Sequence, residues 1–167
     1  KSVISPTDDL PTTNNVNGAW FLVNPGVTFN LKNIVLNGNG FKVWQGIRSH
    51  GKTTIDNVDF SNIYDTTSQY VGFAVASFGG TISGGVGSDT HSSGGASSTL
   101  TVTNSTFTQI GRVGILIKGN GSTATISGNT YTGKGAGDFI DYAFEVGAGG
   151  VATIENNTIS NNIGVAK

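Results

Sequence analysis

The densest group of acidic side chains in the sequence is Asp138, Asp141 and Glu145, within the stretch GAGDFIDYAFEV. Carboxylates that lie close together can bind calcium or accept hydrogen bonds from a sugar. On an alternating strand, Asp141 and Glu145 would both point outward. The other interpretation is that these acids only solubilise a lengthened loop. We favour it, because scattered carboxylates usually form a solvated face. If this acidic group binds a cofactor, calcium is the one that it suits. Otherwise we expect no cofactor.

The two histidines, His50 and His91, are the next candidates for acid–base chemistry. Each lies in a stretch rich in glycine and serine, which predicts a turn or loop. The string Arg48-Ser49-His50-Gly51 has no acidic partner nearby in the sequence. No catalytic or metal-binding residue is therefore predicted, which favours a protein that is not an enzyme.

Composition narrows the function further. The chain has 167 residues, enough for one domain with a sizeable core, and a net charge of −1. Such a small charge argues against nucleic acid and against a polybasic membrane surface. No apolar run approaches the roughly twenty residues of a membrane helix, so no membrane insertion is expected. The chain lacks cysteine and methionine. We expect a processed or excised bacterial protein, secreted or at the cell surface.

An internal repeat reveals the elements that would position these side chains. Its unit is an apolar residue, then Asn or Gly two positions later, then an apolar or aromatic residue five positions after the first. The copies are Leu31-Asn33-Leu36, Ile55-Asn57-Phe60, Val102-Asn104-Phe107, Ile126-Gly128-Tyr131 and Ile154-Asn156-Ile159. Their first members are 24, 47, 24 and 28 residues apart. A degenerate copy, Ile82-Gly84, lies inside the long interval.

A second column of residues follows these copies. Its members are Gly46-Ile47, Gly72-Phe73, Gly114-Ile115, Ala143-Phe144 and Gly164-Val165. Around them apolar residues alternate, as in Val113, Ile115 and Ile117, which is typical of a half-buried strand. Three short strands in each repeat predict an all-β fold, a right-handed parallel β-helix of about five to six coils with roughly 24 residues per coil.

The periodic Asn and Gly residues have a structural explanation. A sharp corner needs a residue that tolerates positive φ, which means glycine or asparagine. The predicted corner ladder consists of Asn33, Asn57, Asn104, Gly128 and Asn156. Stacked asparagines at such corners can hydrogen-bond along the axis.

The domain organisation follows from where the repeat begins. Residues 1–18 are polar and irregular, and we interpret them as a lead-in segment or N-terminal cap. Residues 19–167 are predicted to form the β-helix. A Gly/Ser-rich stretch at 83–98 is predicted to be an excursion from it.

Strings such as TATISGNTYTG and VATIENNTISNN resemble the β-helix repeats of the pectate-lyase-like superfamily, closest in character to bacterial cell-surface members. The resemblance covers residues 19–167. It implies the fold rather than one activity, because the superfamily includes lyases, hydrolases, tailspikes and adhesins. Galacturonan hydrolases of this fold carry N-T-D, D-D, G-H-G and R-I-K motifs, and residues 19–167 of this sequence have none of them.

The predicted outward columns beside the corner are rich in threonine and carry only single charges. They are Lys32, Asp56, Thr103, Ser127 and Glu155, and then Val35, Asp59, Thr106, Thr130 and Thr158. The paired carboxylates that glycoside hydrolysis needs are missing from both columns. A third column, Thr54, Thr101, Thr125 and Thr153, is similar to the hydroxyl arrays of some ice-binding proteins. We favour the simpler explanation, the high β-propensity of threonine.

These features favour a non-catalytic, exported structural or adhesive β-solenoid module. No polar cap follows the last predicted strand in residues 161–167, so end-to-end stacking with another copy is one expected association. The alternative is a carbohydrate-binding or polysaccharide-cleaving, lyase-like module whose partner is a polysaccharide. Testing glycans for binding and for cleavage products would separate the two hypotheses.

Overall fold

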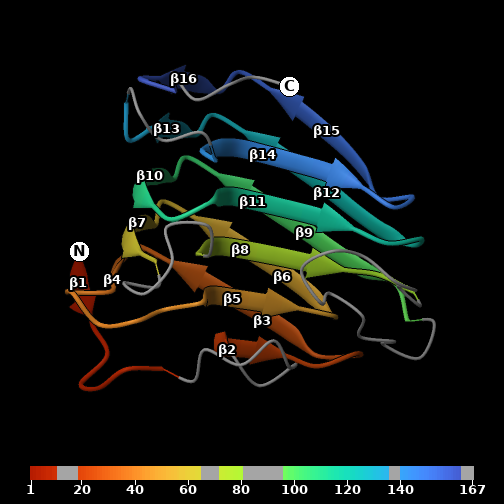
Figure 1. Ribbon diagram of the computed structural model, residues 1–167. Helices are drawn as coiled ribbons and strands as arrows, with labels where there is room; N and C mark the ends of the chain where they lie inside the picture. The colour runs from red at the N-terminus through yellow and green to blue at the C-terminus, as the bar shows by residue number, and fades with distance from the viewer. Residues whose placement is uncertain (11–18, 65–71, 81–95, 136–139, 163–167) are drawn as a thin grey trace.

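The computed structural model describes residues 1–10, 19–64, 72–80, 96–135 and 140–162. Within these ranges the chain forms sixteen strands and no helix. The strands build three parallel sheets that enclose one core (Figure 1). In Figure 1 the strands of one sheet run from left to right at the front, those of a second return at the back, and from β2 onward the chain climbs from bottom to top. This course is a right-handed superhelix, so the predicted all-β parallel β-helix is confirmed.

Each coil contributes one strand to each sheet in turn. Sheet A contains β1 (Ser2–Ile4), β4 (Ile34–Asn37), β7 (Asp59–Ile63), β10 (Thr106–Ile110), β13 (Thr130–Thr132) and β16 (Thr158–Ser160). Sheet B contains β2 (Ala19–Val23), β5 (Gln45–Ser49), β8 (Phe73–Phe78), β11 (Val113–Lys118) and β14 (Tyr142–Gly147). Sheet C contains β3 (Thr28–Lys32), β6 (Lys52–Asp56), β9 (Ser98–Thr103), β12 (Ser122–Ser127) and β15 (Val151–Glu155).

The number of coils is slightly smaller than predicted. Four turns separate the five strands of sheet C, at steps of 24, 47, 24 and 28 residues. The 47-residue step is a single coil, because β6 pairs directly with β9. The degenerate copy Ile82-Gly84 and all but the last three residues of the predicted excursion at 83–98 lie outside the described residues.

In the core, apolar residues of similar type stack on one another in successive coils. Leu36, Phe60, Phe107 and Tyr131 occupy one register column on sheet A and are all buried. The rings of Phe60 and Phe107 lie 4.9 Å apart between centroids at an angle of 3°. A slip of one residue would turn each such side chain to the solvent, so burial of the apolar column sets the register.

The second predicted column is wrong in one coil. Ile47, Ile115 and Phe144 do share a column, but their partner on β8 is Val75, not Phe73. Phe73 lies two residues away, in a smaller apolar cluster outside the main core. Gly72, at φ 135°, makes the tight entry into β8, and this offset is invisible in a pattern of small and apolar residues. Gly164-Val165 lies outside the described residues.

The corner between sheets C and A is made by the five periodic residues, and each has positive φ. The angles are 58° at Asn33, 54° at Asn57, 51° at Asn104, 68° at Gly128 and 55° at Asn156. Hydrogen bonding along this ladder was expected. Of the described side chains, only Asn57 bonds to the next corner residue, Asn33, at 2.7 Å. Asn104 donates instead to Asp56 Oδ1, at 2.9 Å.

A polar ladder that is buried at Ser105 and Asn129 follows the corner residues and was not predicted. Its members are Ser105, Asn129 and Asn157. Asn129 Oδ1 accepts a hydrogen bond from the Ser105 nitrogen at 2.9 Å, and Asn129 Nδ2 donates to the Val102 carbonyl at 3.0 Å. Ser105 Oγ accepts from the Val58 nitrogen at 3.1 Å. These side chains satisfy backbone groups that the corner removes from the sheets.

Within the predicted lead-in, β1 pairs with β4 and Leu10 packs against the core. The Leu10 nitrogen also donates to the Lys42 carbonyl at 2.9 Å. Residues 11–18 lie outside the described part of the chain. The predicted boundary at residue 18 therefore stays a prediction.

Candidate functional site

Asp141 and Glu145, the two acids of the predicted patch that the structure describes, differ in burial. Asp138 lies outside the described residues. Asp141 was expected to point outward, but it is only 2% exposed and faces the interior. It precedes β14 (Tyr142–Gly147), so the alternation of that strand does not extend to it. Glu145 lies within β14 and is partly exposed, beside Leu116 of β11 in the register.

Asp141 belongs to a polar network that ties successive coils together. The hydroxyl of Tyr131 and the backbone nitrogen of Lys134 both donate to its carboxylate, the latter at 2.7 Å. Lys134 Nζ lies 4.0 Å from that carboxylate and donates to the carbonyls of Ile110 and Gly111 at 2.7 and 2.6 Å. Every one of these contacts joins protein groups to one another, which indicates a structural role.

Metal binding was a further possibility for the acids. In the described part of the chain, no group of three or more His, Cys, Asp or Glu side chains is placed to hold a metal ion. A calcium site therefore gains no support from Asp141 and Glu145.

His50 lies between β5 and β6, in the turn region that was predicted for it. It is buried, its ring stacks on Phe78 with centroids 5.7 Å apart, and its Nε2 accepts a hydrogen bond from Arg48 Nε at 3.2 Å. Arg48 itself lies over the Phe78 ring at 4.0 Å. His91 lies outside the described residues.

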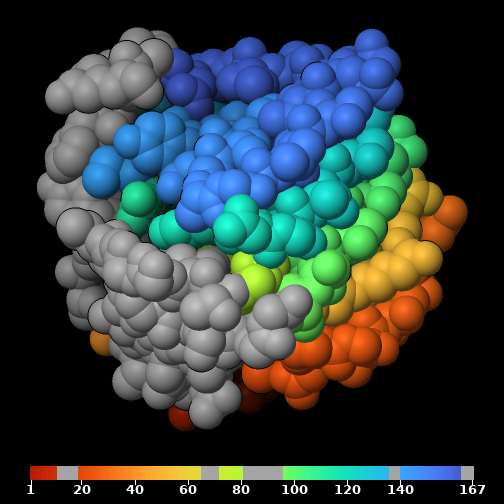
Figure 2. All heavy atoms as spheres, turned by 90° about the vertical axis from the view of Figure 1, so that its right-hand side faces the viewer, coloured from red at the N-terminus to blue at the C-terminus, as the bar shows by residue number. Residues whose placement is uncertain are grey.

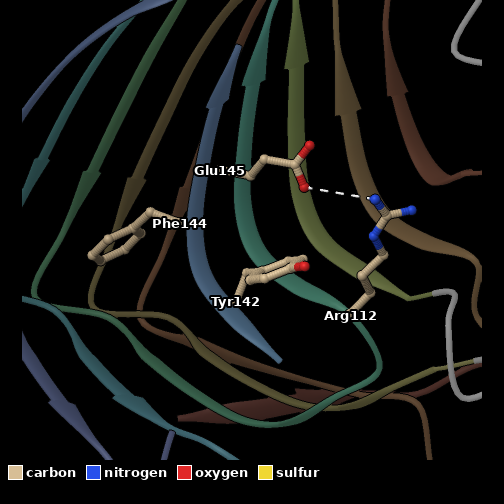
Figure 3. Close-up of a pocket in the computed structure, with 4 residues that line it drawn as sticks. All are labelled: Arg112, Tyr142, Phe144 and Glu145. Atoms are coloured by element: carbon tan, nitrogen blue, oxygen red, sulfur yellow. Dashed lines mark ion pairs between the residues drawn. The ribbon is translucent and has the colours of Figure 1, made fainter. Parts of the chain in front are cut away.

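An open pocket of about 300 Å³ is lined by Arg112, Tyr142, Phe144 and Glu145 (Figure 3). Arg112 directly precedes β11, and the other three residues lie on β14. Figure 3 shows Arg112, Tyr142 and Glu145 grouped on one side of β14, with the Phe144 ring on the other side. No spacing in the sequence brings Arg112 to this group, because β11 and β14 meet only through the coil register.

The polar groups of this pocket leave hydrogen-bonding capacity unused. Arg112 Nη2 and Glu145 Oε2 form an ion pair at 3.9 Å, which is too long for a hydrogen bond. Arg112 Nε and Glu145 Oε2 are shielded from solvent and have no hydrogen-bond partner in the described part of the chain. The Phe73 ring supports the guanidinium, with Arg112 Cζ 5.7 Å from its centroid.

A second candidate surface, which we call the threonine face, covers the outward side of β9 and β12 in sheet C and continues around the corner onto β10 and β13 in sheet A. All ten of its side chains carry a hydroxyl group and none is charged. They are Thr99, Thr101, Thr103, Thr106, Thr108, Thr123, Thr125, Ser127, Thr130 and Thr132. The register aligns them in five pairs across two successive coils. Figure 2 shows the coils as stacked layers, running from orange at the bottom through green and teal to blue at the top.

Three carboxylates border the threonine face, Asp56 and Asp59 on one side and Glu155, the register partner of Ser127, on the other. Asp56 and Asp59 are the register partners of Thr103 and Thr106, which donate to them at 3.0 and 2.8 Å. Each also pairs with a lysine, Lys32 or Lys1, at 2.7 Å. These partners neutralise the two charges where they meet the face.

The same contacts set the acidity of Asp56 and Asp59. Hydrogen bonds from Lys32, Asn104 and Thr103 lower the pKa of Asp56 to about 2. Burial raises the pKa of Asp59, but hydrogen bonds and the nearby positive charge of Lys1 outweigh it, so that this pKa is lowered on balance. Neither carboxylate has the raised pKa expected of a catalytic acid.

Comparison with protein-family models, curated proteins and solved structures finds no significant match to the chain. No helix in the described ranges is long and apolar enough to cross a membrane. The likeness to the pectate-lyase-like superfamily thus stays a prediction. By its structure, the chain belongs to the class of parallel β-solenoids.

Proposed function

We propose that the protein is a non-catalytic structural or adhesive module that holds the threonine face against a partner surface. The observation that carries this proposal is the absence of charge from ten neighbouring outward positions. The surface of a designed soluble domain would place about three charged residues among ten positions. The β-propensity of threonine favours its presence on a strand, but it does not account for the absence of lysine and glutamate from these ten positions.

The chemistry of this face suits a neutral partner that carries hydroxyl groups. Desolvating hydroxyls costs less than desolvating charges, and each hydroxyl can both donate and accept a hydrogen bond. The β-branched threonine side chain is stiff at χ1, so little rotamer freedom is lost on contact. An insoluble neutral polysaccharide has these properties, and it is the partner we propose for an exported, surface-exposed module.

The test is retention on insoluble neutral polysaccharides, such as cellulose, chitin and xylan. A variant with Thr125→Lys and Thr130→Lys introduces two desolvation-costly charges in the middle of the face. We expect its retention to fall by about tenfold or more. The matched control adds the same charge at the exposed β2–β3 turn, with Asn24→Lys and Val27→Lys, and should be retained like the unmodified protein.

The results separate the alternatives. Equal loss in both variants would indicate a general charge effect and contradict the proposal. Unchanged retention of the face variant would also contradict it. No retention of the unmodified protein on any of the polymers would exclude polysaccharide adhesion by this face.

A second candidate association, stacking with another copy, rests on a different observation. Ile154 and Ile159 of the last described coil are 42% and 50% exposed, whereas their register partners Ile126 and Tyr131 are 0% and 2% exposed. A coil from a second molecule, added end to end, would cover these side chains and pair with β15 and β16. The parallel order of all three sheets allows such continuation.

Light scattering over a hundredfold range of protein concentration tests this association. We expect assemblies that grow with protein concentration. The double substitution Ile154→Lys and Ile159→Lys should abolish them. The Asn24→Lys and Val27→Lys protein is the control. A monomer at every concentration would contradict stacking.

A further inference from the structure

The pocket beside β14 combines an aromatic side chain with a pair of charged groups whose hydrogen-bonding capacity is not fully used. None of its residues belongs to the threonine face. Tyr142 contributes the ring, while Arg112 and Glu145 contribute the pair. Figure 3 shows the Tyr142 ring beneath the Glu145 carboxylate, with its hydroxyl directed toward Arg112. Aromatic rings and small sets of convergent polar groups are typical of ligand pockets.

The geometry of the charged pair fits a hydroxyl group. A hydroxyl about 2.9 Å from each atom would complete a triangle with Arg112 Nη2 and Glu145 Oε2, which are 3.9 Å apart. Guanidinium only donates hydrogen bonds and carboxylate only accepts them, whereas a hydroxyl does both. One sugar hydroxyl would thus serve both partners. Because Glu145 Oε2 is shielded from solvent, the two partly exposed side chains must rotate to admit this hydroxyl.

The charge of the pocket selects for a neutral ligand. Arg112 is paired with Glu145, so the two together carry no net charge. A uronate carboxylate that approached Arg112 would lie close to Glu145 as well, and like charges at that separation repel. The volume of about 300 Å³ is at the lower end of ligand pockets, which suits one sugar unit rather than several.

From these observations we infer that the pocket binds one unit of a neutral saccharide. Tyr142 provides the apolar face, and Arg112 and Glu145 bind a ring hydroxyl. This inference does not depend on the threonine face, because the two sites share no residue.

The experiment is calorimetric titration of the full chain with soluble neutral oligosaccharides from glucan, mannan, xylan and chitin. Oligogalacturonate serves as the anionic comparison. We expect saturable binding of at least one neutral series. Glu145→Gln removes the charged acceptor while preserving its volume, and Tyr142→Leu removes the ring but keeps an apolar side chain. Each should weaken binding by about tenfold or more.

Glu155→Gln on β15 is the matched control, because Glu155 is exposed and lies outside the pocket. It should bind like the unmodified protein, and so should the Thr125→Lys and Thr130→Lys protein. Binding that survives both pocket substitutions would overturn the assignment to this site. Stronger binding of oligogalacturonate than of every neutral series would overturn the neutral class. No binding of any neutral oligosaccharide at millimolar concentration would overturn the inference itself.

Discussion

Asn157 Oδ1 accepts hydrogen bonds from both the backbone nitrogen and the side-chain nitrogen of Asn129, one coil away, at 2.9 and 3.0 Å. Asn157 Nδ2 in turn donates to the Ile126 carbonyl at 2.9 Å. The corner residues turn the chain, but these inward asparagines satisfy the backbone groups that the turn exposes to the core. The coil-to-coil stacking of the fold depends on them at this corner.

Replacing Asn129 should therefore lower the stability of the fold. Asn129→Ala removes the partners of the Ser105 nitrogen and the Val102 carbonyl, both in the interior. We expect the free energy of unfolding to fall by about 2–4 kcal/mol, measured by urea denaturation. Asn30→Ala, at an exposed position on β3, is the control and should change stability by less than about 0.5 kcal/mol. Equal effects of the two substitutions would contradict the role of the inward ladder.

The corner itself should be sensitive to backbone conformation rather than to side-chain volume. Asn57 has φ 54°, and Asn57→Ala should destabilise the protein by about 1–2 kcal/mol because alanine resists the left-handed region. Asn57→Gly should cost less than Asn57→Ala, since it removes the bond to Asn33 but relieves the backbone. The two unfolding free energies, compared in one denaturant, test this order. A larger loss for glycine would show that the side-chain bond outweighs the backbone term.

The lowered pKa of Asp56 predicts a specific loss of stability in acid. Its pKa is about 2 in the folded protein, against an ordinary value of 3.8. Ionised Asp56 thus stabilises the fold above pH 3.8, and this contribution is lost as the pH falls through about 2. Thermal melting of Asp56→Asn should show a smaller decrease between pH 4 and pH 2 than the unmodified protein. Glu155→Gln should melt with the unmodified pH dependence, and a parallel change in both variants would refute the assignment.

Mutation of the two described acids of the predicted patch should change stability by very different amounts. Asp141→Ala removes a buried carboxylate that accepts bonds from Tyr131 and Lys134, and we expect a loss of about 3–5 kcal/mol in stability. Glu145→Ala should change stability by less than about 1 kcal/mol, because its ion pair is long and partly exposed. Calorimetric melting of both variants measures this contrast. A stable Asp141→Ala protein would show that the inward network contributes little.

Much of the architecture is predictable because its signals are local in the sequence. Apolar residues recur with the coil period, and the corners between sheets C and A need positive φ, which Asn33, Asn57 and Gly128 supply. The outward threonine columns also follow from strand alternation, and the register aligns Thr101 with Thr125 as expected. Alternation alone was misleading at Asp141, because this residue lies just before its strand begins.

What the tertiary structure decided depends on which coil lies beside which. The pairing of β6 with β9 makes one coil of 47 residues, and the repeat pattern alone suggested a degenerate coil in between. The meeting of Arg112 with Glu145 and the bonds between Asn129 and Asn157 join residues from neighbouring coils, 28 to 33 positions apart. The sequence by itself determined the solenoid and its corners, since these arise from backbone preference and apolar period. The inward polar ladder, the buried carboxylate and the pocket were decided by packing, because hydrogen-bond partners and burial exist only once the coils are stacked.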